Sequence, residues 1–183
     1  LVDATIRFVG KNKLMNKYVT VVLPTHNEEK NILPIINEII ERNKKYDLEI
    51  IIVDDNSTDN TEKLIREYSK KDSRVRLINR IDRFGLSSAI KEGCLNAKGD
   101  IIAVMDSDGQ HEVKSLIEAI DLLSNKSNDL ILGSRFLVKS SIKGLSKKRR
   151  NSSTIANKIA RISLPYKYRN LTDYLTGFFI FNR

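Results

Sequence analysis

The chain has little of what marks secreted, disulfide-stabilised or membrane-spanning proteins. Its 183 residues include one cysteine, three prolines and no tryptophan. The single cysteine, Cys94, excludes a disulfide within the chain, and its apolar neighbours at helical spacing predict a buried thiol in a reducing compartment. No apolar run approaches the roughly 20 residues that cross a bilayer. The first residues also lack the apolar core of a signal peptide, so we expect a cytoplasmic protein.

Two familiar phosphate-binding loops are missing as well. The first predicted strand leads into Pro-Thr-His-Asn-Glu at residues 24–28, where a dinucleotide-binding turn would have Gly-x-Gly-x-x-Gly. Nowhere does the chain contain the Gly-x-x-x-x-Gly-Lys-Ser/Thr loop. A nucleotide diphosphate bound here would therefore be held by carboxylates through a divalent metal.

The charge balance points to an anionic partner. Hydrophobic residues make up 40% of the chain and charged residues 30%, as in a globular domain, and the net charge is +9. Candidate partners are nucleic acid, an acidic membrane surface and a phosphorylated substrate. The densest basic cluster, Lys143 to Arg150, has no interleaved aromatic residues, which argues against nucleic acid.

Alternating apolar runs predict a mostly parallel sheet with helices on both faces, an α/β fold without internal repeats. We expect residues 1–17 to form a weakly ordered tail and residues 18–183 a single domain, cut short at its carboxyl end from a longer protein. The Ser- and Lys-rich residues 137–150 are expected to form a loop. The predicted strands are 18–23, 48–53, 74–78, 101–105 and 129–132, with a last apolar stretch at 179–181. Helices are predicted at 32–40, 86–97, 113–123 and 152–163, and one more follows the second strand and ends near residue 70.

Acidic residues follow two of these strands. Asp106 and Asp108 come after the run 101–105, and the pair Asp54-Asp55 follows the run 48–53. Because ligands bind at the carboxyl ends of parallel strands, these side chains are expected at one rim, where Asp106 and Asp108 could hold Mg²⁺ or Mn²⁺. The alternative is that the acids only cap the following helices. Consecutive strand residues point to opposite sides, so we expect Asp55 to contact a ligand and Asp54 to support the turn.

Six motifs in order resemble those of inverting family 2 glycosyltransferases of the GT-A fold, and among them the dolichyl-phosphate (polyprenyl-phosphate) mannosyltransferases. The resemblance covers about residues 18–183. Two departures from the usual pattern are His26, where an aromatic residue is usual, and Glu112, where proline is usual. The motifs are Val21 to Glu28, Val53 to Ser57, Gly85 to Ala89, Asp106 to His111, Gly133 to Phe136 and Asp173-x-x-Thr176-Gly177-Phe178.

The resemblance implies a role for each matching residue. Pro24, His26, Glu28, Val53 and Asp55 would form the pocket for the nucleotide base and ribose. Asp106, Asp108 and Gln110 would hold the metal, with Ser107 beside them in the donor site. Arg135 would bind the donor diphosphate, while Arg149 and Ser153 would bind the acceptor phosphate; Asp108, Arg135, Arg149 and Ser153 would thus serve catalysis.

The implied reaction is metal-dependent transfer of mannose from GDP-mannose to a dolichyl or polyprenyl phosphate, with inversion, by an enzyme peripheral to the cytoplasmic face of a membrane. The acceptor is already an anion, so a general base is hardly needed. Three alternatives remain open from sequence: a polyprenyl-phosphate glucosyltransferase that uses UDP-glucose, a catalytically inactive nucleotide-sugar binder, and a receiver-like module suggested by Val53 to Asn56.

Overall fold

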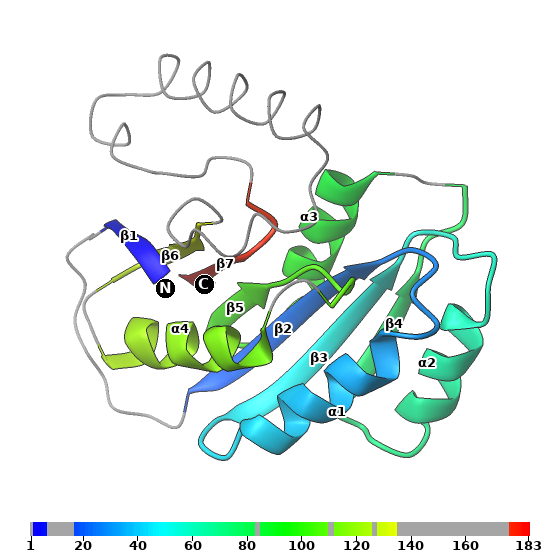
Figure 1. Ribbon diagram of the computed structural model, residues 1–183, viewed down its shortest axis with the longest axis horizontal. Helices are drawn as coiled ribbons and strands as arrows, with labels where there is room; N and C mark the ends of the chain where they lie inside the picture. The colour runs from blue at the N-terminus through cyan, green and yellow to red at the C-terminus, as the bar shows by residue number, and fades with distance from the viewer. Residues whose placement is uncertain (1, 7–16, 83–84, 110–111, 126–127, 135–175) are drawn as a thin grey trace.

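The computed structural model describes residues 2–6, 17–82, 85–109, 112–125, 128–134 and 176–183. Within these residues a seven-stranded sheet has the strand order β1-β6-β7-β5-β2-β3-β4 (Figure 1). The strands are β1 (Val2–Ile6), β2 (Tyr18–Thr25), β3 (Asp47–Asp54), β4 (Val75–Asn79), β5 (Ile101–Val104), β6 (Leu130–Gly133) and β7 (Phe179–Asn182); the helices are α1 (Ile32–Arg42), α2 (Thr61–Ser69), α3 (Leu86–Asn96) and α4 (Val113–Asn125).

The sheet is mostly parallel, as predicted. β2 pairs in parallel with β3 on one side and with β5 on the other, and β3 pairs in parallel with β4. β7 inserts antiparallel between β5 and β6. The direction of this last strand is not predictable from its short apolar run alone.

The amino end differs from the weakly ordered tail that the sequence predicts for residues 1–17. Val2–Ile6 forms β1, which pairs antiparallel with β6 at the edge of the sheet. The sequence of β1 does alternate apolar and polar residues, as a half-buried strand does, but so short a run does not show which strand it pairs with. Residues 7–16 lie outside the described part of the chain.

Helices cover both faces of the sheet. In β3, Ile50 and Ile52 pack in the core shared with α1 and α4, whereas Ile51 and Val53 pack in the smaller core under α3. Figure 1 shows α1 and α4 side by side along one face and α3 on the other. This two-sided burial is why the strand has a continuous apolar run in place of an alternating one.

α1 illustrates how the sequence produces the larger core. Ile32, Ile35, Ile36 and Ile39 recur at the spacing of one helix face, and all four are buried. Burying one such side chain contributes about 1.5–3 kcal/mol to the free energy of unfolding. Among the described helices, none has the length and apolar content needed to cross a membrane.

Candidate functional site

Three strands deliver polar residues to one rim of the sheet. Thr25, the last residue of β2, is paired with Asp54, the last residue of β3. The next backbone hydrogen bond runs from the Asp55 N–H to the Thr25 carbonyl, at 2.8 Å. On the other side of β2, the hydroxyl of Ser107 donates to the carbonyl of Pro24 at 2.9 Å. The loops after β2, β3 and β5 therefore start side by side, as predicted.

Asp54 and Asp55 have different surroundings, although they are neighbours in sequence. The Asp54 side chain is fully buried and accepts hydrogen bonds from the backbone N–H of Ser57 at 3.0 Å and from its hydroxyl at 2.5 Å. These contacts close the turn after β3, in which Asn56 has a φ of 60°. Asp54 thus supports the turn, as the sequence predicts.

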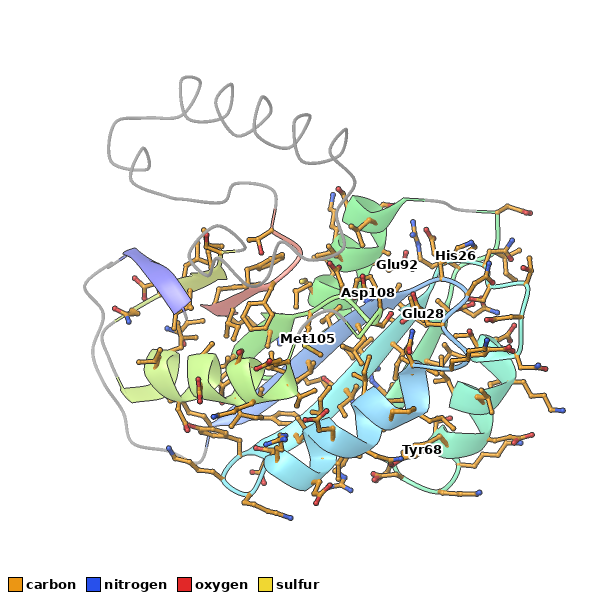
Figure 2. The ribbon with its side chains drawn as sticks, viewed as in Figure 1. His26, Glu28, Tyr68, Glu92, Met105 and Asp108 are labelled. Carbon is orange, nitrogen blue, oxygen red and sulfur yellow. The ribbon has the colours of Figure 1, made fainter. Side chains whose placement is uncertain are left out.

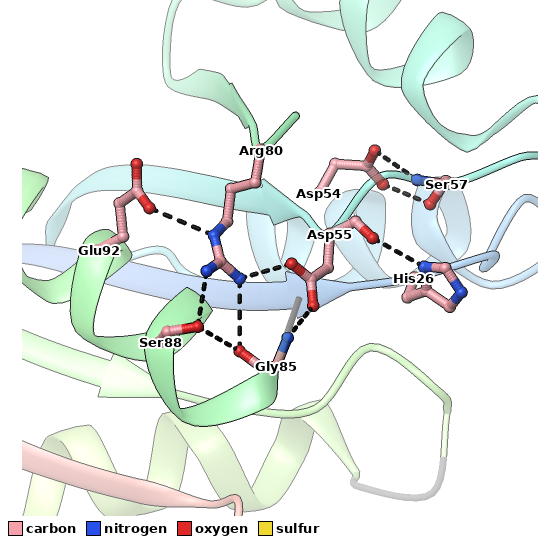
Figure 3. Close-up of polar contacts among 8 residues, drawn as sticks. All are labelled: His26, Asp54, Asp55, Ser57, Arg80, Gly85, Ser88 and Glu92. Atoms are coloured by element: carbon pink, nitrogen blue, oxygen red, sulfur yellow. Dashed lines mark hydrogen bonds and ion pairs between the residues drawn. The ribbon is translucent and has the colours of Figure 1, made fainter. Parts of the chain in front are cut away.

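Asp55 is held by a buried arginine. Nη1 of Arg80 lies 2.5 Å from Oδ1 of Asp55, and the N–H of Gly85 donates to Oδ2 at 2.7 Å (Figure 3). The Arg80 side chain is only 3% exposed and that of Asp55 14%. The other nitrogens of the guanidinium face α3, where Nη2 donates to Ser88 Oγ at 2.6 Å and Nε lies 3.2 Å from Glu92 Oε2.

Arg80 is a site residue that the sequence motifs do not include. Its position directly after β4 is a signal that could have found it, because that position places it at the rim. In the structure it lies next to the Asp54-Asp55 turn, where its own N–H donates to the Asp54 carbonyl at 2.9 Å. A carboxylate at the end of a buried strand needs a compensating charge or hydrogen bonds. A cation at the end of the adjacent strand is the simplest source.

Hydrogen bonds that involve side chains join the loop after β2 to the loop after β3. Nδ1 of His26 lies 2.9 Å from the Asp55 carbonyl; because a carbonyl only accepts, Nδ1 carries the proton in this contact. Asn27, with a φ of 57°, accepts from the Thr58 N–H at 2.8 Å, and its own N–H donates to Ser57 Oγ at 2.8 Å. The position of His26 beside Asp55 is therefore fixed by backbone contacts on both loops.

The other residues predicted for the base and ribose pocket, Val53, Pro24 and Glu28, are buried or half-buried. Val53 is buried in the smaller core, so its backbone and not its side chain borders the rim. Pro24, its partner in the β2–β3 register, is also buried. Glu28 is half-buried and accepts from Asn31 Nδ2 at 2.7 Å.

Asp106 and Asp108 lie on the turn after β5. Asp106 is half-buried, Asp108 is exposed, and Gly109 follows with a φ of 75°. Figure 2 shows Asp108, Glu28 and His26 at the same end of the sheet. Among the described residues no three His, Cys, Asp or Glu side chains cluster. Two carboxylates fit a hard cation such as Mg²⁺, which commonly takes one or two carboxylates and completes its shell with water and phosphate oxygens.

Several predicted residues lie outside the described part of the chain. These are Gln110, Arg135, Arg149 and Ser153. A separate surface hollow of about 370 Å³ lies at the amino ends of α1 and α2 and includes none of the rim carboxylates Asp55, Asp106 and Asp108; it is lined by Glu29, Lys30, Asn60, Lys63, Leu64 and Glu67. The described candidate site is therefore the rim formed by the loops after β2, β3 and β5.

Comparison with known proteins decides the family. The sequence profile described as "Glycosyl transferase family 2" matches residues 20–183. This chain belongs to glycosyl transferase family 2. Because the matching profile spans residues 20–183, the receiver-like alternative is excluded. It also accounts for the α/β architecture, which is the GT-A fold of the structural neighbours.

Family 2 relatives of known activity cover most of this chain. It is 35% identical over 161 residues to a dolichol-phosphate mannosyltransferase of Pyrococcus furiosus, an alignment that covers 88% of this chain and 45% of that protein. It is 33% identical over 138 residues to a dolichyl-phosphate beta-glucosyltransferase of Dictyostelium discoideum, covering 69% and 42%. The chain thus spans less than half the length of these curated relatives.

Solved structures agree on the fold. The mannosyltransferase PcManGT of Pyrobaculum calidifontis, in complex with GDP-Man and Mn²⁺, superposes with a TM-score of 0.56 at 26% identity, over 68% of this chain and 37% of that one. A mannosyl-3-phosphoglycerate synthase of Rubrobacter xylanophilus gives 0.71 at 16% identity, over 91% and 54%. The second likeness bears on the fold alone.

Proposed function

We propose that this family 2 domain transfers mannose from GDP-mannose to a dolichyl or polyprenyl phosphate. The observation that carries the proposal is the convergence at one rim of Asp55 with Asp106 and Asp108, where no glycine-rich phosphate loop is available. Such a rim could bind a nucleotide diphosphate sugar, with Asp55 contacting the nucleoside and Asp106 and Asp108 holding the metal that binds the diphosphate. The Pyrococcus relative and the GDP-Man complex of PcManGT support this choice of donor.

In this proposal the donor lies across the ends of β2, β3 and β5. Asp55 binds the base or ribose, together with Pro24, His26, Glu28 and Val53, and its orientation is set in advance by Arg80. Asp106, Asp108 and Gln110 would hold Mg²⁺ or Mn²⁺ beside Ser107. Such an ion, when bound, would supply positive charge to stabilise the leaving diphosphate. A preset carboxylate lowers the entropy lost on binding, which is why the Arg80 contacts matter for affinity.

The acceptor phosphate supplies its own nucleophile. One of its oxygens forms the new bond to the anomeric carbon, the bond from that carbon to the nucleoside diphosphate breaks, and the configuration inverts. Arg135 is assigned to the donor diphosphate, while Arg149 and Ser153 are assigned to the acceptor phosphate. A guanidinium can contact two phosphate oxygens at once, which suits the alignment of two anions. A lipid acceptor places the domain at a membrane surface, which we propose to be the cytoplasmic face.

A second candidate is transfer of glucose from UDP-glucose to the same class of lipid. The observation that favours it is that relatives from Trichomonas vaginalis and Dictyostelium discoideum at about 30% identity are dolichyl-phosphate beta-glucosyltransferases. Asp55 and the backbone around Val53 could bind either nucleoside. The two candidates share the fold, the metal and the acceptor, and differ in the base and the sugar.

Donor binding tests the proposal directly. The melting temperature of the protein would be measured with GDP-mannose and with UDP-glucose, each with and without Mn²⁺. A donor at 100 times its dissociation constant adds about 2.7 kcal/mol to the free energy of unfolding. We expect the larger shift with GDP-mannose and only when Mn²⁺ is present. An equal response to both donors, or none to either, would remove the support for mannose transfer.

A further inference from the structure

We propose that Gly177 is a positioning residue that keeps open the space occupied by the carboxylate of Asp106. Gly177 lies just before β7, 71 residues after Asp106 along the chain. A Cβ atom at Gly177 would lie 2.6 Å from Oδ1 and 2.7 Å from Cγ of Asp106, and closer still to Oδ2. Carbon and oxygen atoms do not approach so closely without repulsion, so any side chain at this position would displace the carboxylate.

The requirement for glycine here comes from space and not from backbone conformation. Gly85 and Gly109 have φ values of 123° and 75°, a region that other residues rarely adopt. Gly177 is not among the described glycines with positive φ. Alanine is therefore compatible with the backbone at 177, and the three atoms nearest its Cβ would all belong to Asp106.

The backbone of Gly177 is held on both sides. The Phe178 N–H donates to Thr176 Oγ1 at 3.1 Å, and the Phe178 carbonyl accepts from the Gly133 N–H at 2.9 Å. The Phe178 side chain is 3% exposed, and β7 then continues between β5 and β6. The carboxylate of Asp106 ends a short side chain with rotatable bonds, so it would move more easily than the segment that faces it.

The antiparallel insertion of β7 thus brings the segment 176–178 against one of the two metal-site acids. This inference rests on the proposed role of Asp106 as a metal ligand. If that role is right, Gly177→Ala rotates one ligand out of position while leaving the sheet intact. Changes to residues that orient metal ligands typically lower metal affinity about 10- to 100-fold.

The test is Mn²⁺ binding to the full chain in the presence of GDP and, separately, of UDP. Free Mn²⁺ is measured by electron paramagnetic resonance, without turnover. We expect Gly177→Ala to bind Mn²⁺ about 10- to 100-fold more weakly than wild type. Gly99→Ala is the matched control: its Cβ would lie 2.6 Å from the backbone N and 2.8 Å from Oγ1 of Thr20, next to the amino end of β5 and away from the rim. This control should lower the melting temperature and leave Mn²⁺ affinity unchanged.

A second measurement isolates the contact itself. The melting temperature is compared for Gly177→Ala in the wild-type and in the Asp106→Ala backgrounds. Truncating Asp106 removes the atoms nearest to the new methyl group. The decrease in melting temperature caused by Gly177→Ala should therefore be smaller, or absent, in the double variant. An undiminished loss would overturn the inference, and so would wild-type Mn²⁺ affinity in Gly177→Ala. Absence of Mn²⁺ binding in the wild-type protein itself would instead contradict the proposed metal site.

Discussion

The carboxylate of Asp55 and the guanidinium of Arg80 form a nearly buried ion pair at the end of β3, with Oδ1 2.5 Å from Nη1. The same guanidinium contacts Ser88 and Glu92 of α3. The pair therefore joins the proposed nucleoside-binding carboxylate to the helix that covers the smaller core. In the proposed function, fold stability and donor binding would both depend on this ion pair.

Replacing Arg80 should lower both the free energy of unfolding and the affinity for the donor. Arg80→Gln leaves the half-buried Asp55 without its cation, and breaking a nearly buried pair in this way is expected to destabilise the protein by up to about 3–5 kcal/mol. Urea unfolding measures that change, and calorimetric titration measures the loss of donor affinity. Arg74→Gln is the control, because Arg74 pairs with Asp72 while 46% exposed, where about 0–1 kcal/mol is expected. Equal effects of the two substitutions would contradict the special role of Arg80.

Substitution of Asp55 should mainly weaken donor binding, whereas substitution of Asp54 should mainly lower stability. From sequence alone, Asp55→Ala would be expected to weaken donor binding with little effect on stability. The structure changes this expectation, because the substitution also removes the Asp55 carboxylate from the buried Arg80, which keeps its contacts with Glu92 and Ser88. Asp55→Asn keeps the size and an acceptor for the Gly85 N–H, so it is the better variant. We expect it to weaken donor binding at least tenfold by titration.

Asp54→Ala provides the comparison. It removes the two hydrogen bonds from Ser57 at a fully buried position and should destabilise the protein by about 1–3 kcal/mol for each unsatisfied group. Its effect on donor affinity, measured at a temperature where the variant is folded, should be the smaller of the two. If Asp54→Ala weakened donor binding more than Asp55→Asn, the assignment of the two acids would be reversed.

Asp108 should matter for the metal and not for folding. Its side chain is exposed, so Asp108→Asn is expected to change the free energy of unfolding by no more than about 0.5 kcal/mol. The added thermal stability that Mn²⁺ gives in the presence of donor should disappear. Chelation by EDTA should have the same effect on the wild-type protein, and a metal-dependent shift that survived in Asp108→Asn would exclude Asp108 as a ligand.

Cys94 should react slowly in the folded protein, where it is half-buried and not fully buried as the sequence predicts. Burial raises the pKa of its thiol, so at pH 8 a smaller fraction is thiolate than in an exposed cysteine, and the reactive form appears only at higher pH. Iodoacetamide labelling followed by mass spectrometry should be slower than in urea-unfolded protein at the same pH. Equal labelling rates in the folded and the unfolded protein would contradict the raised pKa of the Cys94 thiol.

The parallel part of the sheet could be predicted from sequence because both faces are buried. Apolar runs such as Ile50 to Val53 are unambiguous when each is followed by a polar loop and an amphipathic helix. The predicted strands agree with β2 to β6 to within two residues at each end. The rim carboxylates follow from the same pattern, because topology places the carboxyl ends of parallel strands together.

What could not be predicted depends on contacts distant in sequence. The position of β7 between β5 and β6 follows from pairing with strands about 50 to 80 residues earlier, which no local pattern encodes. Gly177 belongs to one of the six sequence motifs, but its contact with Asp106 is seen only in the structure. Arg80 is one of 32 lysine and arginine residues, and although it directly follows a predicted strand, its burial and its contact with Asp55 are seen only in the structure.

The most direct test of the proposed reaction is product formation. The protein would be incubated with a short-chain, water-soluble polyprenyl phosphate, Mn²⁺ and either GDP-mannose or UDP-glucose, and the lipid fraction examined by mass spectrometry. The short chain removes the contribution of a membrane surface. Mannosyl phosphoryl polyprenol formed from GDP-mannose, and absent when Asp108→Asn replaces wild type, is the predicted result. Folded, Mn²⁺-binding protein that forms no glycosylated lipid from either donor would contradict it.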